Sequence, residues 1–184
     1  LTDHTGTTHL IYFNRTRHEG RNRSGDLYYR QRLDGNRWSP AIRVSDQSFS
    51  HMGPVGKASA YIDDQQRLHV VWFLPDTGYR YTRSNLTRTT FEPGRAVVTE
   101  FTDGLDAEAN LTGVDNLITI TWHAGSLINE AARAVYSMTS ESHGISFGAA
   151  QLTSDPALGA CACCTLDSQY DPQKNLQIAY RSAI

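Results

Sequence analysis

The sequence has no long apolar run, and neither sign of charge dominates it. Its 39% hydrophobic residues fall in short runs, and none approaches the roughly 18 consecutive apolar residues of a membrane-spanning helix. The 17 Lys and Arg residues against 19 Asp and Glu residues give a formal net charge of -2, which is not the basic field that draws a protein to nucleic acid. We therefore expect neither a membrane span nor a nucleic-acid partner.

Cysteine is scarce and is confined to one stretch. All three cysteines, Cys161, Cys163 and Cys164, lie in GACACCTLD (159–167). Three thiols cannot all pair within one chain, so a plain framework of disulfides is excluded and at least one sulfur is left for another role.

Helical periodicity is almost absent, and a strand-like segment recurs instead. It ends on Tyr12, Trp72, Trp122 or Tyr180, and it reads HLIYF (9–13), RLHVVWF (67–73), LITITWH (117–123) and LQIAYRS (176–182). The first three copies are each followed by a hairpin pattern, and the last three are each preceded by a strand running into a turn. The unit is a four-stranded meander of about 50 to 60 residues, which is typical of a β-propeller.

The sequence predicts an all-β, single-domain β-propeller of four-stranded antiparallel blades. We expect blades at residues 1–50, 51–102 and 103–156, and an incomplete one at 157–184. About three and a half blades are then present, whereas propellers usually close with about four to eight. We expect the remaining blades to come from a longer chain that forms a six-bladed ring, with completion by an oligomer as the alternative.

The segment DGNRWSP (34–40) resembles the Asp-box, or bacterial neuraminidase repeat, of sialidase-like propellers. SHGISF (142–147) and TRTTF (87–91) are similar to weaker copies of it. The resemblance implies a sialidase-like scaffold with Asp-boxes at blade turns away from the active site. The Arg-Ile-Pro or Arg-Leu-Pro motif of sialidases is absent, and of their three carboxylate-binding arginines only Arg181 lies in a comparable place, at the end of an inner strand.

Alignment of the repeats places the candidate site. SHMG (50–53), DGLDAE (103–108) and CACC (161–164) each lead into the innermost strand of a blade, and rotation about the propeller axis should bring these entries together at the channel mouth. We expect Arg181, Asp103, Asp106 and His51 to bind substrate there. Two or three thiolates with a histidine suit Cu(I) or Zn(II), so the candidate metal ligands are Cys161, Cys163, Cys164, His51 and Met52.

The residue types also allow simpler roles. The cysteines could instead be buried thiols, or one disulfide with a buried third thiol, because in an extended strand the Cα atoms of Cys161 and Cys163 would lie roughly 6.6 Å apart. His69 is expected to be structural, and His4, His9, His18 and His143 are expected on surface turns or strands. Blade packing is the expected role of the aromatic residues Trp38, Trp72, Phe91, Trp122 and Phe147, and turn formation that of Asp34, Asp63, Asp64, Asp115 and Asp171.

Three classes of function follow from these observations. The first is a secreted or periplasmic sialidase-like propeller that binds or cleaves a carbohydrate or another small ligand at the channel mouth. The second is a copper- or zinc-binding, or redox, propeller centred on the CACC stretch. The third is a non-catalytic scaffold that docks partner proteins.

Overall fold

The computed structural model describes residues 1–15, 24–50, 58–74, 77–105, 109–161 and 163–183. These residues form antiparallel strands joined by turns and three short 3-10 turns, η1 (Asp34–Asn36), η2 (Glu130–Ala132) and η3 (Pro156–Leu158). In the described residues no helix is long and apolar enough to cross a membrane. The all-β prediction is therefore confirmed.

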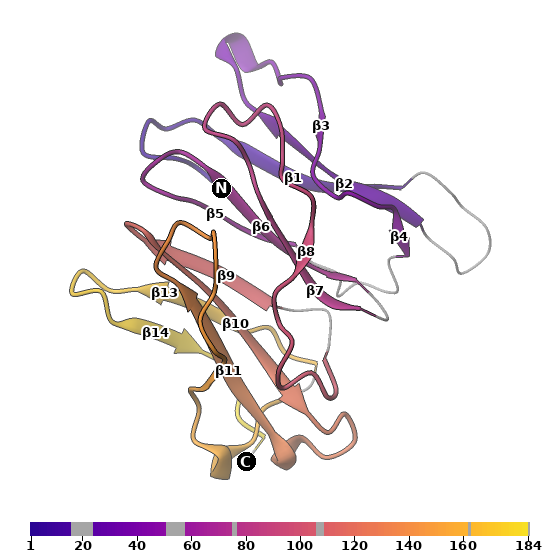
Figure 1. The fold of residues 1–184 in the computed structure, drawn as a ribbon, viewed down its shortest axis with the longest axis vertical. Coiled ribbons are helices and arrows are strands. Elements are labelled where there is room, and N and C mark those ends of the chain that lie inside the picture. Colours follow the sequence, from indigo (N-terminus) through magenta and orange to yellow (C-terminus); the bar gives the residue numbers. More distant parts are fainter. Residues whose placement is uncertain (16–23, 51–57, 75–76, 106–108, 162, 184) are drawn as a thin grey trace.

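The strands form four sheets that follow one another along the chain (Figure 1). The first contains β1 (His9–Arg15), β2 (Ser24–Gln31), β3 (Ile42–Arg43) and β4 (Phe49–Ser50). The second contains β5 (Ser59–Ile62), β6 (Leu68–Leu74), β7 (Gly78–Arg83) and β8 (Arg95–Ala96). The third contains β9 (Ala109–Val114), β10 (Leu117–Gly125), β11 (Arg133–Ser140) and β12 (Gln151–Leu152). The last pairs β13 (Asp167–Tyr170) with β14 (Leu176–Ala179).

Four-stranded antiparallel sheets are thus observed in three of the repeats. In the first sheet, the backbones of Leu1 and His9 each donate a hydrogen bond to the other's carbonyl, on the edge of β1. Leu1 thus takes the position that β5 and β9 occupy in the next two sheets. The number of blades in a closed ring stays a prediction.

Strand direction gives the sheets two distinct ends. Because neighbouring strands are antiparallel, the end of β6 and the start of β7, the end of β10 and the start of β11, and the strand ends at which one sheet leads to the next all lie at one end of the sheets. We call it the connection end. The β5–β6 turn and the β2–β3, β7–β8 and β11–β12 hairpins lie at the other, the turn end.

The core consists of two layers that lie between successive sheets. Side chains alternate in direction along β6, so Leu68, Val70 and Trp72 pack with residues of the first sheet while Val71 packs with residues of the third. This explains why nearly every residue of β6 is buried, as is expected for a strand with both faces covered. The expected packing roles of Trp72, Trp122, Phe91 and Phe147 are confirmed by these two clusters. Trp38 is 40% exposed on the outer part of the first sheet, so its expected role in blade packing stays a prediction.

Two sheets contain the same buried Asp–His–Tyr arrangement. In the second sheet, His69 shares hydrogen bonds with Asp63 Oδ2 (3.1 Å) and with the Tyr81 hydroxyl (2.6 Å). In the first sheet, His9 lies in the same way between Asp3 Oδ2 (3.0 Å) and the Tyr29 hydroxyl (2.9 Å). The structural role expected for His69 is confirmed.

The surface placement expected for His9 is wrong, because only 2% of it is exposed. Its ring lies between Asp3 and Tyr29 and hydrogen-bonds with both, a role that its polar sequence context did not reveal. His4 and His143 do lie at turns, and His18 is outside the described residues.

The expected turn role of the aspartates is confirmed at two equivalent positions. Asp63 Oδ1 accepts a hydrogen bond from the backbone N–H of Arg67 (2.7 Å), and Asp171 Oδ1 accepts one from Asn175 (2.8 Å). Each carboxylate thus closes the turn that joins the first two strands of its repeat.

Candidate functional site

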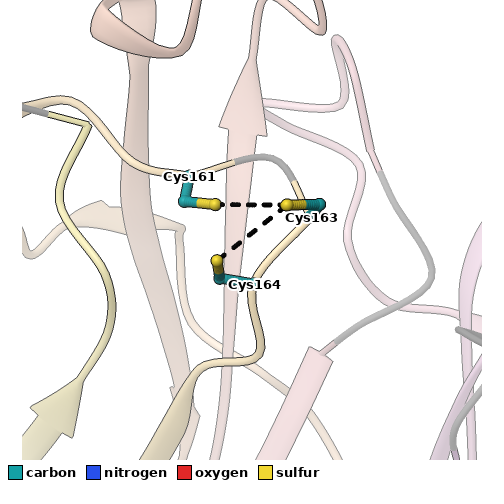
Figure 2. Close-up of side chains that lie close together, drawn as sticks. All are labelled: Cys161, Cys163 and Cys164. Atoms are coloured by element: carbon teal, nitrogen blue, oxygen red, sulfur yellow. Dashed lines mark hydrogen bonds between the residues drawn. The ribbon is translucent and has the colours of Figure 1, made fainter.

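The three cysteines meet at the connection end of the third and fourth sheets. Cys161 is buried, Cys164 is half-buried and Cys163 is exposed. The Sγ atom of Cys163 lies 3.5 Å from that of Cys161 and 4.0 Å from that of Cys164, and all three sulfurs lie within 4.8 Å of one another. Figure 2 shows the three side chains directed toward one common point.

The cysteines lie in a bend before β13 and not in an extended strand. The strand geometry from which their Cα separation was expected is therefore not the observed one, and the Sγ atoms of Cys161 and Cys163 lie 3.5 Å apart. The reading in which all three thiols are packed fails for Cys163, which is exposed, and all three thiols are free in this structure.

Backbone hydrogen bonds hold this bend against two other segments. The N–H of Cys161 donates to the carbonyl of Arg181 (3.0 Å), and the N–H of Ala160 donates to the carbonyl of Glu130 (3.1 Å). Gly159, just before them, has a φ of 61°, and a Cβ there would overlap the carbonyl oxygen of Glu130. Glycine is thus required for the close approach of this bend to η2.

His123 and Arg133 support the bend from the third sheet. Arg133 is only 1% exposed, and its Nη2 donates to Nδ1 of His123 (2.7 Å). Because a guanidinium can only donate, this nitrogen of His123 is the acceptor and Nε2 carries the proton. Nε2 then donates to the carbonyl of Cys164 (3.1 Å), while Nη1 of Arg133 donates to the carbonyl of Gly104 (2.9 Å).

Arg181 supplies the positive charge next to the sulfurs. Its Nη1 donates to Sγ of Cys164 at 3.6 Å, and this hydrogen bond is the main reason that the pKa of Arg181 is raised. The pKa of the Cys161 thiol is lowered, chiefly by its hydrogen bond with Cys164. The pKa of Cys163 is raised to about 11, because Cys161 and then Cys164 hydrogen-bond with it. Of these two thiols, Cys161 accordingly deprotonates more readily than Cys163.

The structure brings together only part of the predicted site. Arg181 lies with the cysteines, and the Asp103–Gly104 segment is joined to them through Arg133 and His123. The Asp103 side chain is exposed. His51, Met52 and Asp106 lie outside the described residues.

Sequence reasoning missed His123 and Arg133. His123 ends the repeated strand segment LITITWH, where the second copy has Phe73, so the change from an aromatic to an imidazole was the available signal. Nothing in the sequence marks Arg133, whose importance comes from being buried.

A cavity of about 460 Å³ opens between the second and third sheets at the connection end. Its lining combines apolar side chains with two glycines and two threonines: Phe73, Thr77, Gly78, Thr102, Gly104, Leu105 and Leu127. Asp103 lies between two of these lining residues in the sequence.

A second group of potential metal ligands, Asp63, Asp64 and His143, lies at the turn end. Oδ2 of Asp63 is shared between Nε2 of His69 (3.1 Å) and Nδ1 of His143 (3.2 Å). His143 lies in the turn between β11 and β12 of the third sheet, so this group joins two sheets. The hydrogen bonds already occupy Oδ2 of Asp63 and Nδ1 of His143, two of the atoms that would bind a metal.

No protein-family model and no curated protein matches the chain. Solved structures do match it across nearly its whole length. The chain superposes on a xylan β-1,4-xylosidase from Bacillus halodurans with a TM-score of 0.58 and 16% identity, covering 98% of this chain and 36% of the xylosidase. For a protein of unknown function from Dyadobacter fermentans the TM-score is 0.66 at 10% identity, with 99% and 48% covered. For the Aleuria aurantia lectin, in complex with Fucα1-6GlcNAc, it is 0.56 at 13% identity, with 96% and 50% covered.

The chain therefore spans about a third to a half of the length of the structures that it matches. The xylosidase and the lectin have propeller folds. Together with the repeated four-stranded sheets, this similarity establishes that the chain has the fold of part of a β-propeller.

Proposed function

We propose that this chain is part of a β-propeller that binds carbohydrate at its connection end, and that the longer protein cleaves it. The observation that carries the proposal is the shared fold, because the structures that match this chain include a lectin in complex with Fucα1-6GlcNAc and a xylan β-1,4-xylosidase. Fold alone leaves the activity open, so the site must be argued from this chain's residues.

The cavity beside Asp103 suits a sugar. Saccharide rings present both apolar C–H faces and hydroxyl groups, and ligand sites combine apolar walls with a few polar groups. Here Phe73, Leu105 and Leu127 supply apolar surface. Asp103 lies between two lining residues in the sequence, and its exposed carboxylate would accept hydrogen bonds from hydroxyl groups.

A sialidase-type specificity is the narrower form of this proposal. It rests on the Asp-box resemblance of residues 34–40, which occupy a hairpin turn at the turn end, and on Arg181, whose guanidinium lies at the connection end. Arg181 would then contact the carboxylate of an anionic sugar. A secreted or periplasmic location goes with this form of the proposal.

We also propose that further blades of a longer chain complete a six-bladed ring. The support is the face of the first sheet that points away from the second sheet, where Leu10 is 41% and Trp38 is 40% exposed. These residues line a shallow apolar hollow with Tyr12 and Arg30, which is the kind of surface that an adjoining blade would cover.

Direct binding measurements test the carbohydrate proposal. Calorimetric titration with xylo-oligosaccharides, Fucα1-6GlcNAc and sialyllactose should show saturable binding of at least one of them. Asp103→Asn and Leu127→Ala, both at exposed side chains, should each raise Kd by about tenfold, as is usual for losing one good polar or apolar contact.

The matched control is Asp34→Asn, which changes an exposed aspartate at the turn end. It should leave Kd unchanged. If none of the saccharides binds, or if Asp34→Asn weakens binding as much as Asp103→Asn, the carbohydrate site is not where we place it, and a scaffold that docks partners becomes the better account.

A further inference from the structure

We propose that Cys161, Cys163 and Cys164 bind one monovalent copper ion as three thiolates. The inference does not depend on carbohydrate binding, because its ligands are the three sulfurs; only Arg181 is shared with the sialidase-type form of that proposal. It starts from the convergence of the three sulfurs at the connection end, where each lies within 4.8 Å of the other two (Figure 2).

The distances between the sulfurs fit a metal–thiolate centre. With metal–sulfur bonds of about 2.3 Å, three sulfurs around one ion in a plane would lie about 4.0 Å apart. Sγ of Cys163 lies 3.5 Å and 4.0 Å from the other two sulfurs, at or slightly below this value, and the third separation is within 4.8 Å. Only small rotations of the side chains are needed to close the site.

The donor set favours Cu(I) over Zn(II). Thiolates are soft ligands that select Cu(I), whereas structural zinc sites almost always have four ligands. Among the described residues, the group of metal-ligating side chains that contains these sulfurs has three members. The nearby imidazole of His123 already donates from Nε2 to Cys164 and accepts at Nδ1 from Arg133, so it serves to position the bend.

The surroundings hold the sulfurs in place before any ion arrives. The N–H of Cys161 is bonded to Arg181 and the carbonyl of Cys164 to His123, which fixes the bend at both ends. A three-thiolate Cu(I) centre carries two negative charges, and the guanidinium of Arg181, 3.6 Å from Sγ of Cys164, offsets one of them. Such supporting groups commonly change metal affinity by about 10- to 100-fold. The exposed Cys163 gives the ion a path from solvent.

The main competing state is a disulfide between Cys161 and Cys163. Their sulfurs are 3.5 Å apart, well beyond a disulfide bond of about 2.0 Å, but oxidation could join them and remove two ligands. Copper binding and disulfide formation are therefore distinguishable, since one requires three reduced thiols and the other consumes two.

The test is an anaerobic titration of the reduced protein with Cu(I) in the presence of a chromogenic Cu(I) chelator. We expect one Cu(I) per chain, and X-ray absorption of the loaded protein should show sulfur neighbours only. Cys163→Ser and Cys164→Ser should each lose at least tenfold in affinity, and Arg181→Gln should weaken binding by several-fold.

Two controls separate a built site from ordinary thiol affinity. A synthetic peptide of residues 159–167 has the same three cysteines without Arg181 and His123, and it should bind Cu(I) at least tenfold more weakly than the protein. The double variant D64N/H143Q, which alters the other potential ligand group, should bind Cu(I) as the unaltered protein does. Circular dichroism on every variant confirms that it is folded.

Three results would overturn the proposal. They are equal affinity of the peptide and the protein, unchanged binding in both Cys163→Ser and Cys164→Ser, and preference for Zn(II) over Cu(I). Carbohydrate titrations of the same Cys163→Ser protein should be unaffected, so failure of the copper site and failure of the carbohydrate site are told apart.

Discussion

Arg133 is a cation buried beneath the candidate site, where a single side chain connects three separate segments. It donates to the carbonyl of Gly104 and to the ring of His123, and His123 donates in turn to Cys164. A buried polar group costs free energy unless it is hydrogen-bonded, so each member of this chain of contacts depends on the next. The tautomer of His123, with its proton on Nε2, is a direct consequence of this arrangement.

We expect Arg133→Met to lower the free energy of unfolding by about 3 kcal/mol, because it leaves buried acceptors without a donor. Urea unfolding would measure this loss. If Arg133 also sets the tautomer of His123, the imidazole of this variant should change from the Nε2–H form to a mixture of tautomers, which ¹⁵N NMR would detect. An unchanged tautomer would contradict the role that we assign to Arg133.

At the scale of the element, the hairpin turn between β11 and β12 fits closely against the second sheet. Gly144 in this turn has a φ of 75°, and a Cβ there would overlap the hydroxyl of Tyr81, which hydrogen-bonds with His69. Arg95 donates to the carbonyl of Gly144 (2.6 Å), so the turn of one sheet is held directly by a side chain of the previous sheet. The hairpins therefore act as contacts between sheets.

Gly144→Ala should destabilise the protein by about 3 to 4 kcal/mol, which sums the cost of a left-handed alanine and that of overpacking against Tyr81. The matched control is Gly35→Ala in the first hairpin, where φ is 67° but nothing lies within 4 Å of an added Cβ. It should cost only about 1 to 2 kcal/mol. Equal losses in thermal or urea unfolding would show that the packing against Tyr81 is unimportant.

At the scale of the whole molecule, two sheets share the same dependence on pH. Burial lowers the pKa of His9 and His69, and the pKa values of Asp3 and Asp63 are also lowered despite their burial, by hydrogen bonds that include those from these histidines. The other charged groups that face these pairs are Arg83 and His143 at His69, and Arg88 and the N-terminal amine at His9.

Both kinds of shift act in the same direction on acidification. A histidine whose pKa is lowered in the folded state takes up a proton more readily in the unfolded chain, so stability falls as the pH drops through about 6.5. An aspartate whose pKa is lowered stabilises the fold above about pH 4, and this contribution is lost as the pH falls below that value. We expect the free energy of unfolding to be constant between pH 8 and 7 and to fall progressively below that.

Urea unfolding at pH 8, 7, 6, 5 and 4 measures this prediction. The double variant H9Q/H69Q should be less stable at pH 8 yet vary less between pH 7 and 5, since the titrating groups are gone. A variant as pH-dependent as the unaltered protein would place the effect elsewhere.

Much of the fold could be predicted from the sequence because strand patterns are local. The four copies of the aromatic-ended segment each became a strand, β1, β6, β10 or β14, and three of the repeats became four-stranded antiparallel sheets. Alternation along a strand and turn chemistry at Asp63 and Asp171 depend on residues a few positions apart. A strand or a turn of this kind can therefore be predicted from the residues of its own segment.

The sequence by itself determined that the protein is built from repeated β-meanders and that its three thiols lie within one short stretch. Only the tertiary structure decided that Cys164 meets His123, 41 residues away, and Arg181, 17 residues away, or that His9 is buried while Trp38 is exposed. These outcomes depend on how the sheets pack against one another. That packing is set by contacts between distant segments, which no local pattern of residues contains.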